Sequence, residues 1–234
     1  ISYHTGGGDV CKGGFYRRSG TEGRKLATLK YWLWLTGRRG LGNAGALRVL
    51  DHFVTPERAF YADPEEYALV EDLTPAARRA LLDKDTGGAE RILEDCARLD
   101  LRIMTLQDAD YPERLRQLPD PPLALYIRGR TFAFDEEAAV CMVGAREATP
   151  YGIGSAGRLG LELARGGALV VSGMAQGIDT ASVQGALKGG GPVVSVLGGG
   201  VDVPYPRENR WLYEDVAAAG ALISEYPPGT EHRG

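Results

Sequence analysis

Short apolar runs rich in β-branched residues recur through the second half of this chain and alternate with segments of helical periodicity. The runs predict strands over 138–143, 168–172, 192–197 and 220–224, and the segments between them predict helices over 152–166, 178–188 and 207–219. Strand–helix–strand units cross over with a right hand, so we expect a doubly wound parallel sheet with helices on both faces. The predicted fold class is therefore α/β with a Rossmann-like sheet.

Each predicted strand ends in a loop that contains glycine or a small polar residue. In an open parallel sheet these loops meet at the carboxyl ends of the strands, where ligands bind. Glycine lets backbone N–H groups approach an anion, and an arginine offers a forked donor to a phosphate. We therefore predict a binding site for a phosphorylated ligand, built from Gly144, Arg146, Ser172, Gly173, Gln176, Gly177, Gly199, Gly200, Tyr205 and Asn209.

Three residues of these loops have a second interpretation. Arg146 is either the phosphate ligand or a solvated surface arginine. The ring of Tyr205 either offers a face on which a base stacks or packs against the sheet. Asp179 lies in the first turn of a predicted helix, where a carboxylate suits the helix dipole, and capping is its favoured role.

The loops Gly144-Ala-Arg146, Ser172–Asp179, Leu197–Pro206 and Ser224–Thr230 resemble, in this order, those of the DNA-processing protein A family, also called DprA or Smf. The resemblance runs from about Leu26 to Thr230. It implies single-stranded DNA binding and loading of the RecA recombinase during DNA uptake and natural transformation. It also implies a homodimer in the full-length protein, a cytoplasmic location, and no catalysis, metal or cofactor.

This chain departs from the family pattern at several loop positions. Ala145 replaces a serine or threonine, and Gln176, Val183 and Gln184 stand where arginine, histidine and a basic residue are common in the family. These departures remove polar contacts to DNA, while the residues that define the fold are kept.

The first part of the chain predicts a separate helical unit. Thr55-Pro and Thr74-Pro each place an N-cap residue before a proline, which is typical of helix starts. The Gly40-Leu-Gly42 turn resembles a helix-hairpin-helix phosphate grip or is a tight turn that needs positive φ. We predict a tail over 1–25, a small all-helical domain of the SAM or helix-hairpin-helix type over 26–86, and the Rossmann-like domain over 87–234.

In the DprA family further strands and helices follow the Ser224–Thr230 segment. The sequence in hand stops at Gly234, so we expect the strand at 220–224 to lack the neighbours that cover it, and the protein to be less stable and less dimeric than a longer one.

Composition limits the remaining functions. The formal charge of −4 gives no overall basic signature, so a nucleic-acid site must be local. Cys96 and Cys141 are predicted to be small buried hydrophobes, and no apolar run reaches the length of a membrane span. The GxGxxG match over 152–157 lies too far from its strand for a dinucleotide loop and is interpreted as close helix–sheet packing. The alternative function is a nucleotide-binding or nucleotide-hydrolysing enzyme that uses Glu225 or Asp202 on a ribose.

Overall fold

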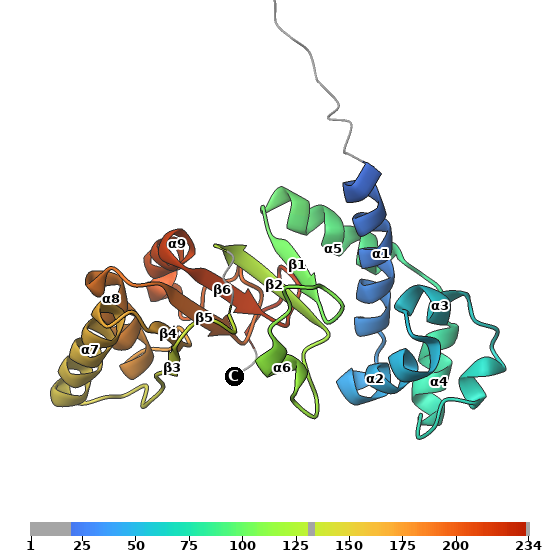
Figure 1. The fold of residues 1–234 in the computed structure, drawn as a ribbon, viewed down its shortest axis with the longest axis horizontal. Coiled ribbons are helices and arrows are strands. Elements are labelled where there is room, and N and C mark those ends of the chain that lie inside the picture. The colour runs from blue at the N-terminus through green and yellow to red at the C-terminus, as the bar shows by residue number, and fades with distance from the viewer. Residues whose placement is uncertain (1–19, 131–133, 233–234) are drawn as a thin grey trace, which may run out of the picture.

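The computed structural model describes residues 20–130 and 134–232, and a six-stranded sheet lies at its centre (Figure 1). The strands follow the order β1-β2-β6-β5-β4-β3. Their bounds are β1 Arg102–Thr105, β2 Ala124–Gly129, β3 Ala139–Cys141, β4 Leu169–Ser172, β5 Val193–Leu197 and β6 Ala221–Ser224. Strands β3 to β6 are parallel, as predicted, whereas β1 and β2 form an antiparallel hairpin that pairs with β6.

Three helices connect the parallel strands: α7 Pro150–Arg165, α8 Ile178–Gly189 and α9 Arg210–Ala219, the last preceded by the short 3₁₀ helix η2 Arg207–Asn209. Each confirms a predicted helix within a few residues. Side chains from all three helices share one core cluster with β4, β5 and β6, so these helices cover the same face of the sheet. Each new strand is added on the same side of the previous one, and right-handed crossovers then place every helix on one face. The predicted α/β class is confirmed, and among the described residues the three helices that connect the parallel strands lie on one face of the sheet.

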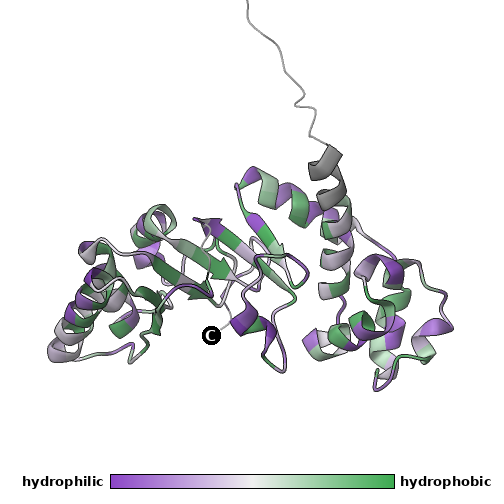
Figure 2. Cartoon of the chain, in the orientation of Figure 1, coloured by the Kyte–Doolittle hydropathy of each residue, from purple (hydrophilic) through white to green (hydrophobic). Residues whose placement is uncertain are grey.

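The strands of the sheet are largely hydrophobic (Figure 2), and their face opposite α7, α8 and α9 is apolar and only partly covered. Helix α6 Glu113–Arg116 and the segment around it shield the β1–β2 end. Over the central strands a cavity of about 380 Å³ remains open, and it is lined by Leu169, Val171, Val194, Val196 and Ile223 together with side chains of the 112–125 segment. Half of the Val196 side chain is exposed there.

The free edge of the parallel strands is β3, which corrects the expectation that strand 220–224 lacks neighbours. Strand β6 lies between β2 and β5 and pairs with both. All three residues of β3 are exposed, including Cys141. Cys141 is therefore not the buried hydrophobe that was predicted, because its strand has one paired side and faces the open surface. Cys96 is buried, as predicted.

The first helices form the unit at the other end of the molecule from α7 and α8 (Figure 1). They are α1 Gly20–Thr36, α2 Gly42–Phe53, α3 Pro56–Tyr61, η1 Glu66–Ala68 and α4 Pro75–Leu82. The hydroxyl oxygens of Thr55 and Thr74 accept N–H groups of the first turns of α3 and α4, which confirms both caps. Gly40 and Gly42 adopt positive φ. Helix α1 begins six residues before the predicted boundary of this unit, and residues 1–19 of the predicted tail lie outside the described residues.

Helix α5 Gly87–Arg98 joins the helical unit to the sheet. Leu29 and Leu33 of α1 share a core cluster with Cys96 of α5 and with Ile103 and Tyr126 of the hairpin. The two parts therefore pack through a continuous apolar contact. The division into domains at residues 86 and 87 stays a prediction, although α5 begins at that point.

Glycines set the approach of α7 to α8 rather than to the sheet. A Cβ atom at Gly185 would lie 2.0 Å from the carbonyl oxygen of Gly157, and one at Gly160 would lie 2.3 Å from that of Ser182. Backbones this close exclude any side chain. The predicted close packing of the GxGxxG stretch against the sheet is therefore wrong: Gly157 packs against helix α8, and a Cβ atom at Gly154 would have no neighbour within 4 Å.

Candidate functional site

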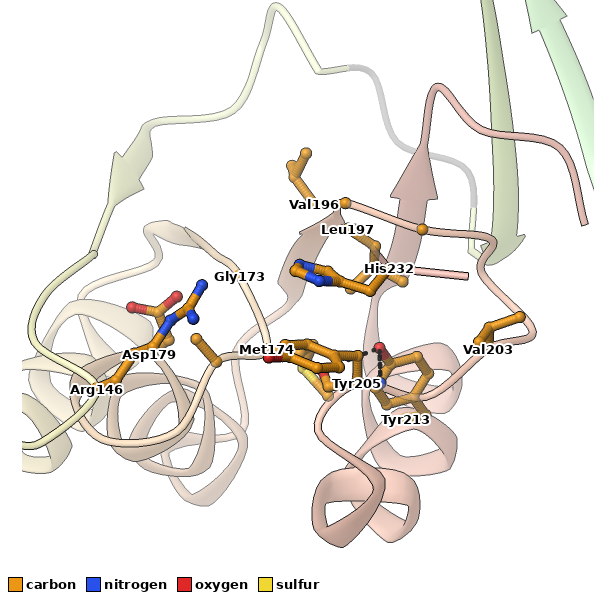
Figure 3. Close-up of a pocket in the computed structure, with 13 residues that line it drawn as sticks. Arg146, Gly173, Met174, Asp179, Val196, Leu197, Val203, Tyr205, Tyr213 and His232 are labelled. Atoms are coloured by element: carbon orange, nitrogen blue, oxygen red, sulfur yellow. Dashed lines mark hydrogen bonds between the residues drawn. The ribbon is translucent and has the colours of Figure 1, made fainter. Parts of the chain in front are cut away.

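The largest gathering of predicted site residues surrounds a small cavity at the carboxyl ends of β4 and β5 (Figure 3). Its volume is about 110 Å³, which accommodates a few water molecules or a compact anion. Four predicted residues line it, namely Arg146, Gly173, Gly199 and Tyr205. The other lining residues are Met174, Ala175, Asp179, Val196, Leu197, Gly198, Val203, Tyr213 and His232.

The Asp179 carboxylate ties two of the loops together. It accepts the backbone N–H of Gly144, with 3.2 Å between nitrogen and Oδ1, and the N–H of Gly173. Burial raises the pKa of the Asp179 carboxyl above its ordinary value, while the two N–H groups and the charge of Arg146 act in the opposite direction. The predicted capping role of Asp179 is wrong, because helix α8 has no side-chain cap and the carboxylate binds N–H groups of the two preceding loops instead.

Gly177 fixes the position of the Arg146 loop from the other side. Its φ is +83°, and a Cβ atom there would lie 2.3 Å from the carbonyl oxygen of Ala145. The next residue, Ile178, donates its N–H to the same oxygen at 3.2 Å. Only glycine combines this backbone conformation with this approach. Gly144 and Gly177 therefore shape the arginine loop without lining the cavity.

Arg146 supplies a positive charge at the cavity. Its side chain is exposed and lies beside Asp179 (Figure 3), and within the described residues its guanidinium makes no hydrogen bond or ion pair. The Asp179 carboxylate accepts the backbone N–H groups of Gly144 and Gly173, and the charge of Arg146 acts on it without a hydrogen bond among the described residues. The N–H groups of Arg146 remain open to a ligand.

The glycines of the third loop contact the protein's own chain. The N–H of Gly200 donates to the carbonyl of Thr230 at 2.8 Å, and a Cβ atom at Gly199 would lie 2.9 Å from that same oxygen. The Asp202 carboxylate accepts the N–H of Gly229, and Ser224 donates its hydroxyl to the carbonyl of Gly199. We call residues 229–232 the strap, because this segment lies over the glycine loop.

Tyr205 carries the aromatic surface of the site. Its ring is 40% exposed and stacks on the imidazole of His232, with centroids 3.9 Å apart and planes 6° from parallel. Its backbone N–H donates to the hydroxyl of Tyr213 at 3.1 Å, which fixes the loop above α9 (Figure 3). His232 was not predicted as a site residue, since it follows the last recognisable pattern and no spacing marks it.

Four further predicted site residues lie outside the cavity. Ser172 is buried and donates its hydroxyl to the carbonyl of Met142 at 2.6 Å, so this donor serves the sheet. Asn209 is also buried, and its amide donates to the carbonyl of Met174 at 2.8 Å and to the hydroxyl of Thr180 at 2.7 Å. Gln176 is exposed and does not line the cavity. Gly200 is buried beneath the strap.

Little in the described residues supports catalysis by this site. No group of three or more histidine, cysteine or acidic side chains is placed there to hold a metal ion. The Asp202 carboxylate accepts the N–H of Gly229 in the strap, and Glu225 lines other cavities. The two acidic residues that the alternative enzyme would use therefore do not meet at the Arg146 cavity. Nor does any described helix combine the length and apolarity needed to cross a membrane.

The sheet, with a small polar cavity at the carboxyl ends of its parallel strands, places this protein in the class of Rossmann-like α/β proteins. Comparison with known families narrows the class. The family model of DNA recombination-mediator protein A matches residues 102–234, more than half of the sequence. The chain belongs to the DNA recombination-mediator protein A family.

Individual relatives also match this chain, and each is longer than the segment that matches. Protein Smf of Synechocystis sp. is 32% identical over 209 residues, which are 86% of this chain and 52% of that protein. The DNA processing protein DprA of Bacillus subtilis is 33% identical over 141 residues, 60% of this chain and 48% of that protein. The chain thus spans about half the length of these relatives. The X-ray structure of DprA from Streptococcus pneumoniae matches with a TM-score of 0.72 at 25% identity, covering 86% of this chain and 69% of that one.

Proposed function

We propose that this protein binds single-stranded DNA at the Arg146 cavity and acts, without catalysis, as a recombination mediator. The observation that carries the proposal is the open guanidinium of Arg146 beside a cavity of about 110 Å³ at the strand ends. A guanidinium and backbone N–H groups recognise a phosphate, while a tyrosine ring at the same cavity recognises a base of any sequence. The names of the relatives, which describe DNA processing, support the same function.

The binding mode follows from the size and charge of the site. A single arginine and an overall charge of −4 offer few phosphate contacts, so affinity depends weakly on salt. A single strand exposes its bases for stacking on Tyr205, whereas a duplex hides them. Single strands are therefore bound in preference to duplex, with little dependence on sequence.

Three parts of the proposal rest on the family resemblance. They are loading of the RecA recombinase, formation of a homodimer by the full-length protein, and a cytoplasmic location. The chain spans only about half the length of these relatives, so these three properties are proposed for the whole protein.

The proposal is tested by replacing Arg146 with alanine. Loss of a charge-assisted contact weakens binding by roughly 1–3 kcal/mol, measured by fluorescence anisotropy of a labelled oligonucleotide at one salt concentration. Arg79→Ala, which removes an exposed arginine of α4, is the matched control and leaves affinity unchanged. The slope of log K against log salt is about −0.7 per phosphate neutralised.

Three results would reject the proposal: equal affinity of the wild type and Arg146→Ala, tighter binding of duplex, or turnover of a nucleotide. The first would show that the cavity is not the DNA site. The third would favour the enzyme alternative.

A further inference from the structure

The imidazole of His232 occupies the space over the ring of Tyr205. One face of the imidazole lies 3.9 Å from the Tyr205 centroid in a nearly parallel stack. On another side, a Cβ atom built at Gly198 would lie 3.2 Å from both Cδ2 and Nε2 of the imidazole. A flat aromatic group thus stacks on the Tyr205 ring beside a glycine backbone, and an aromatic ring is the surface on which proteins stack a base of a single strand.

The imidazole of His232 lacks a hydrogen-bond partner for one of its nitrogens among the described residues. Its Nδ1 atom is buried and has no hydrogen-bond partner among the described residues. A buried polar atom without a partner costs stability, so the space suits another flat group that can pair its polar edge better.

The strap can release the ring without losing its anchors. The N–H of Gly229 is held by Asp202, the carbonyl of Thr230 by Gly200, and the hydroxyl of Thr230 by the carbonyl of Pro227. Among the described residues these backbone and hydroxyl bonds end at Thr230, two residues before the histidine. Rotation about the bonds of residues 231 and 232 therefore moves the imidazole out while Gly229 and Thr230 stay in place.

We propose that His232 is an internal placeholder for a base of the bound single strand. A base replaces the imidazole between Tyr205 and the Gly198 loop, while a neighbouring phosphate reaches Arg146 at the same cavity. The inference rests on the proposed function and adds to it a subsite and a residue that opposes binding. Both groups cannot stack on Tyr205 at once, so His232 lowers the affinity of the wild-type protein.

The sign of one mutational effect tests this inference. His232→Ala frees the Tyr205 face, and we expect it to bind an oligonucleotide about two- to tenfold tighter, the factor for removing a competing aromatic pair. With 2-aminopurine in the oligonucleotide, the fluorescence is quenched more strongly by the variant because the base stacks on Tyr205. Unchanged or weaker binding by His232→Ala would overturn the proposal.

Two further variants separate this effect from others. In a Tyr205→Ala background, which itself binds more weakly, His232→Ala gives no gain because the stacking surface is gone. His52→Ala, which removes an exposed histidine of α2, is the matched control and leaves affinity unchanged. A gain from His232→Ala that survives Tyr205→Ala would contradict the placeholder role.

The two hypotheses fail in different ways. If Arg146→Ala leaves oligonucleotide affinity unchanged both in the wild-type protein and in the His232→Ala variant, the proposed DNA site is wrong. If Arg146→Ala weakens binding but His232→Ala does not strengthen it, the DNA site stands and the placeholder is wrong. In wild-type protein, the ring-proton NMR signals of His232, shifted by the Tyr205 ring, move toward unstacked values as the oligonucleotide is added; an unchanged position at saturation would likewise overturn the placeholder.

Discussion

The helical unit and the cavity at the strand ends each contain a positively charged side chain, and the surroundings of the two side chains differ. The ammonium of Lys84 lies between Trp34, Phe60 and Tyr67, at 5.0, 5.3 and 4.8 Å from the ring centroids, and it donates to the Tyr67 hydroxyl. Burial lowers the pKa of the Lys84 amine to about 8. Arg146, in contrast, lies in a glycine loop, and its guanidinium donates no hydrogen bond to any residue that the structure describes.

The difference arises from the residues that build each region. The helical unit has a core of large side chains, in which Trp32, Trp34, Tyr67, Leu35 and Leu81 are nearly completely buried. Around the cavity, glycines bring backbone segments together, and among the described residues no aromatic ring encloses the Arg146 guanidinium, which lies beside Asp179. A cation enclosed by aromatic rings stabilises the fold, whereas a cation on a backbone scaffold is offered to a ligand.

The largest effect is expected from the aromatic core. Trp34→Ala removes a ring that is 1% exposed and an indole N–H that donates to the carbonyl of Asp83, so we expect a loss of roughly 3–5 kcal/mol in the free energy of unfolding. Urea denaturation measures it. Leu69→Ala, at a side chain that is 67% exposed, is the control and changes little. A loss below 1 kcal/mol for Trp34→Ala would mean that the helical unit does not depend on this core.

A smaller loss is expected where backbones pack. Gly177→Ala puts a Cβ atom against the Ala145 carbonyl in a backbone conformation that alanine avoids, which costs roughly 1–3 kcal/mol and displaces the Arg146 loop. We expect lower stability together with weaker oligonucleotide binding. Gly154→Ala, within α7 and without a neighbour within 4 Å, instead adds up to about 1 kcal/mol of stability. Normal affinity in Gly177→Ala would show that the loop position is not critical.

Loss of a helix cap should give the smallest loss of stability, and the loss should be the same in the helical unit and beside the cavity. Thr74 accepts the N–H of Ala77 at 3.1 Å in the helical unit, and Thr149 accepts that of Gly152 at 3.2 Å beside the cavity. Each alanine variant is expected to lose about 1 kcal/mol, measured by thermal unfolding. Clearly unequal losses would indicate that the two regions do not unfold as one cooperative unit.

Local patterns predicted the elements of this fold well. Every strand and helix predicted after residue 87 is present within a few residues, because β-branched runs, proline starts and glycine stops act locally. The same patterns placed four glycine-containing loops at one sheet edge, since parallel strands share the direction of their carboxyl ends. Arg146, Gly173, Gly199 and Tyr205 accordingly meet at one cavity.

The remaining properties depend on contacts between distant segments. The sequence by itself determined the α/β class, the element order and the loops that carry the site. Only the tertiary structure decided that Ser172 and Asn209 donate inward, that Cys141 lies exposed on an edge strand, and that His232 covers Tyr205. A hydrogen-bond partner or a stacked ring far away in the chain leaves no periodicity, because its position is set by how the strands and helices pack.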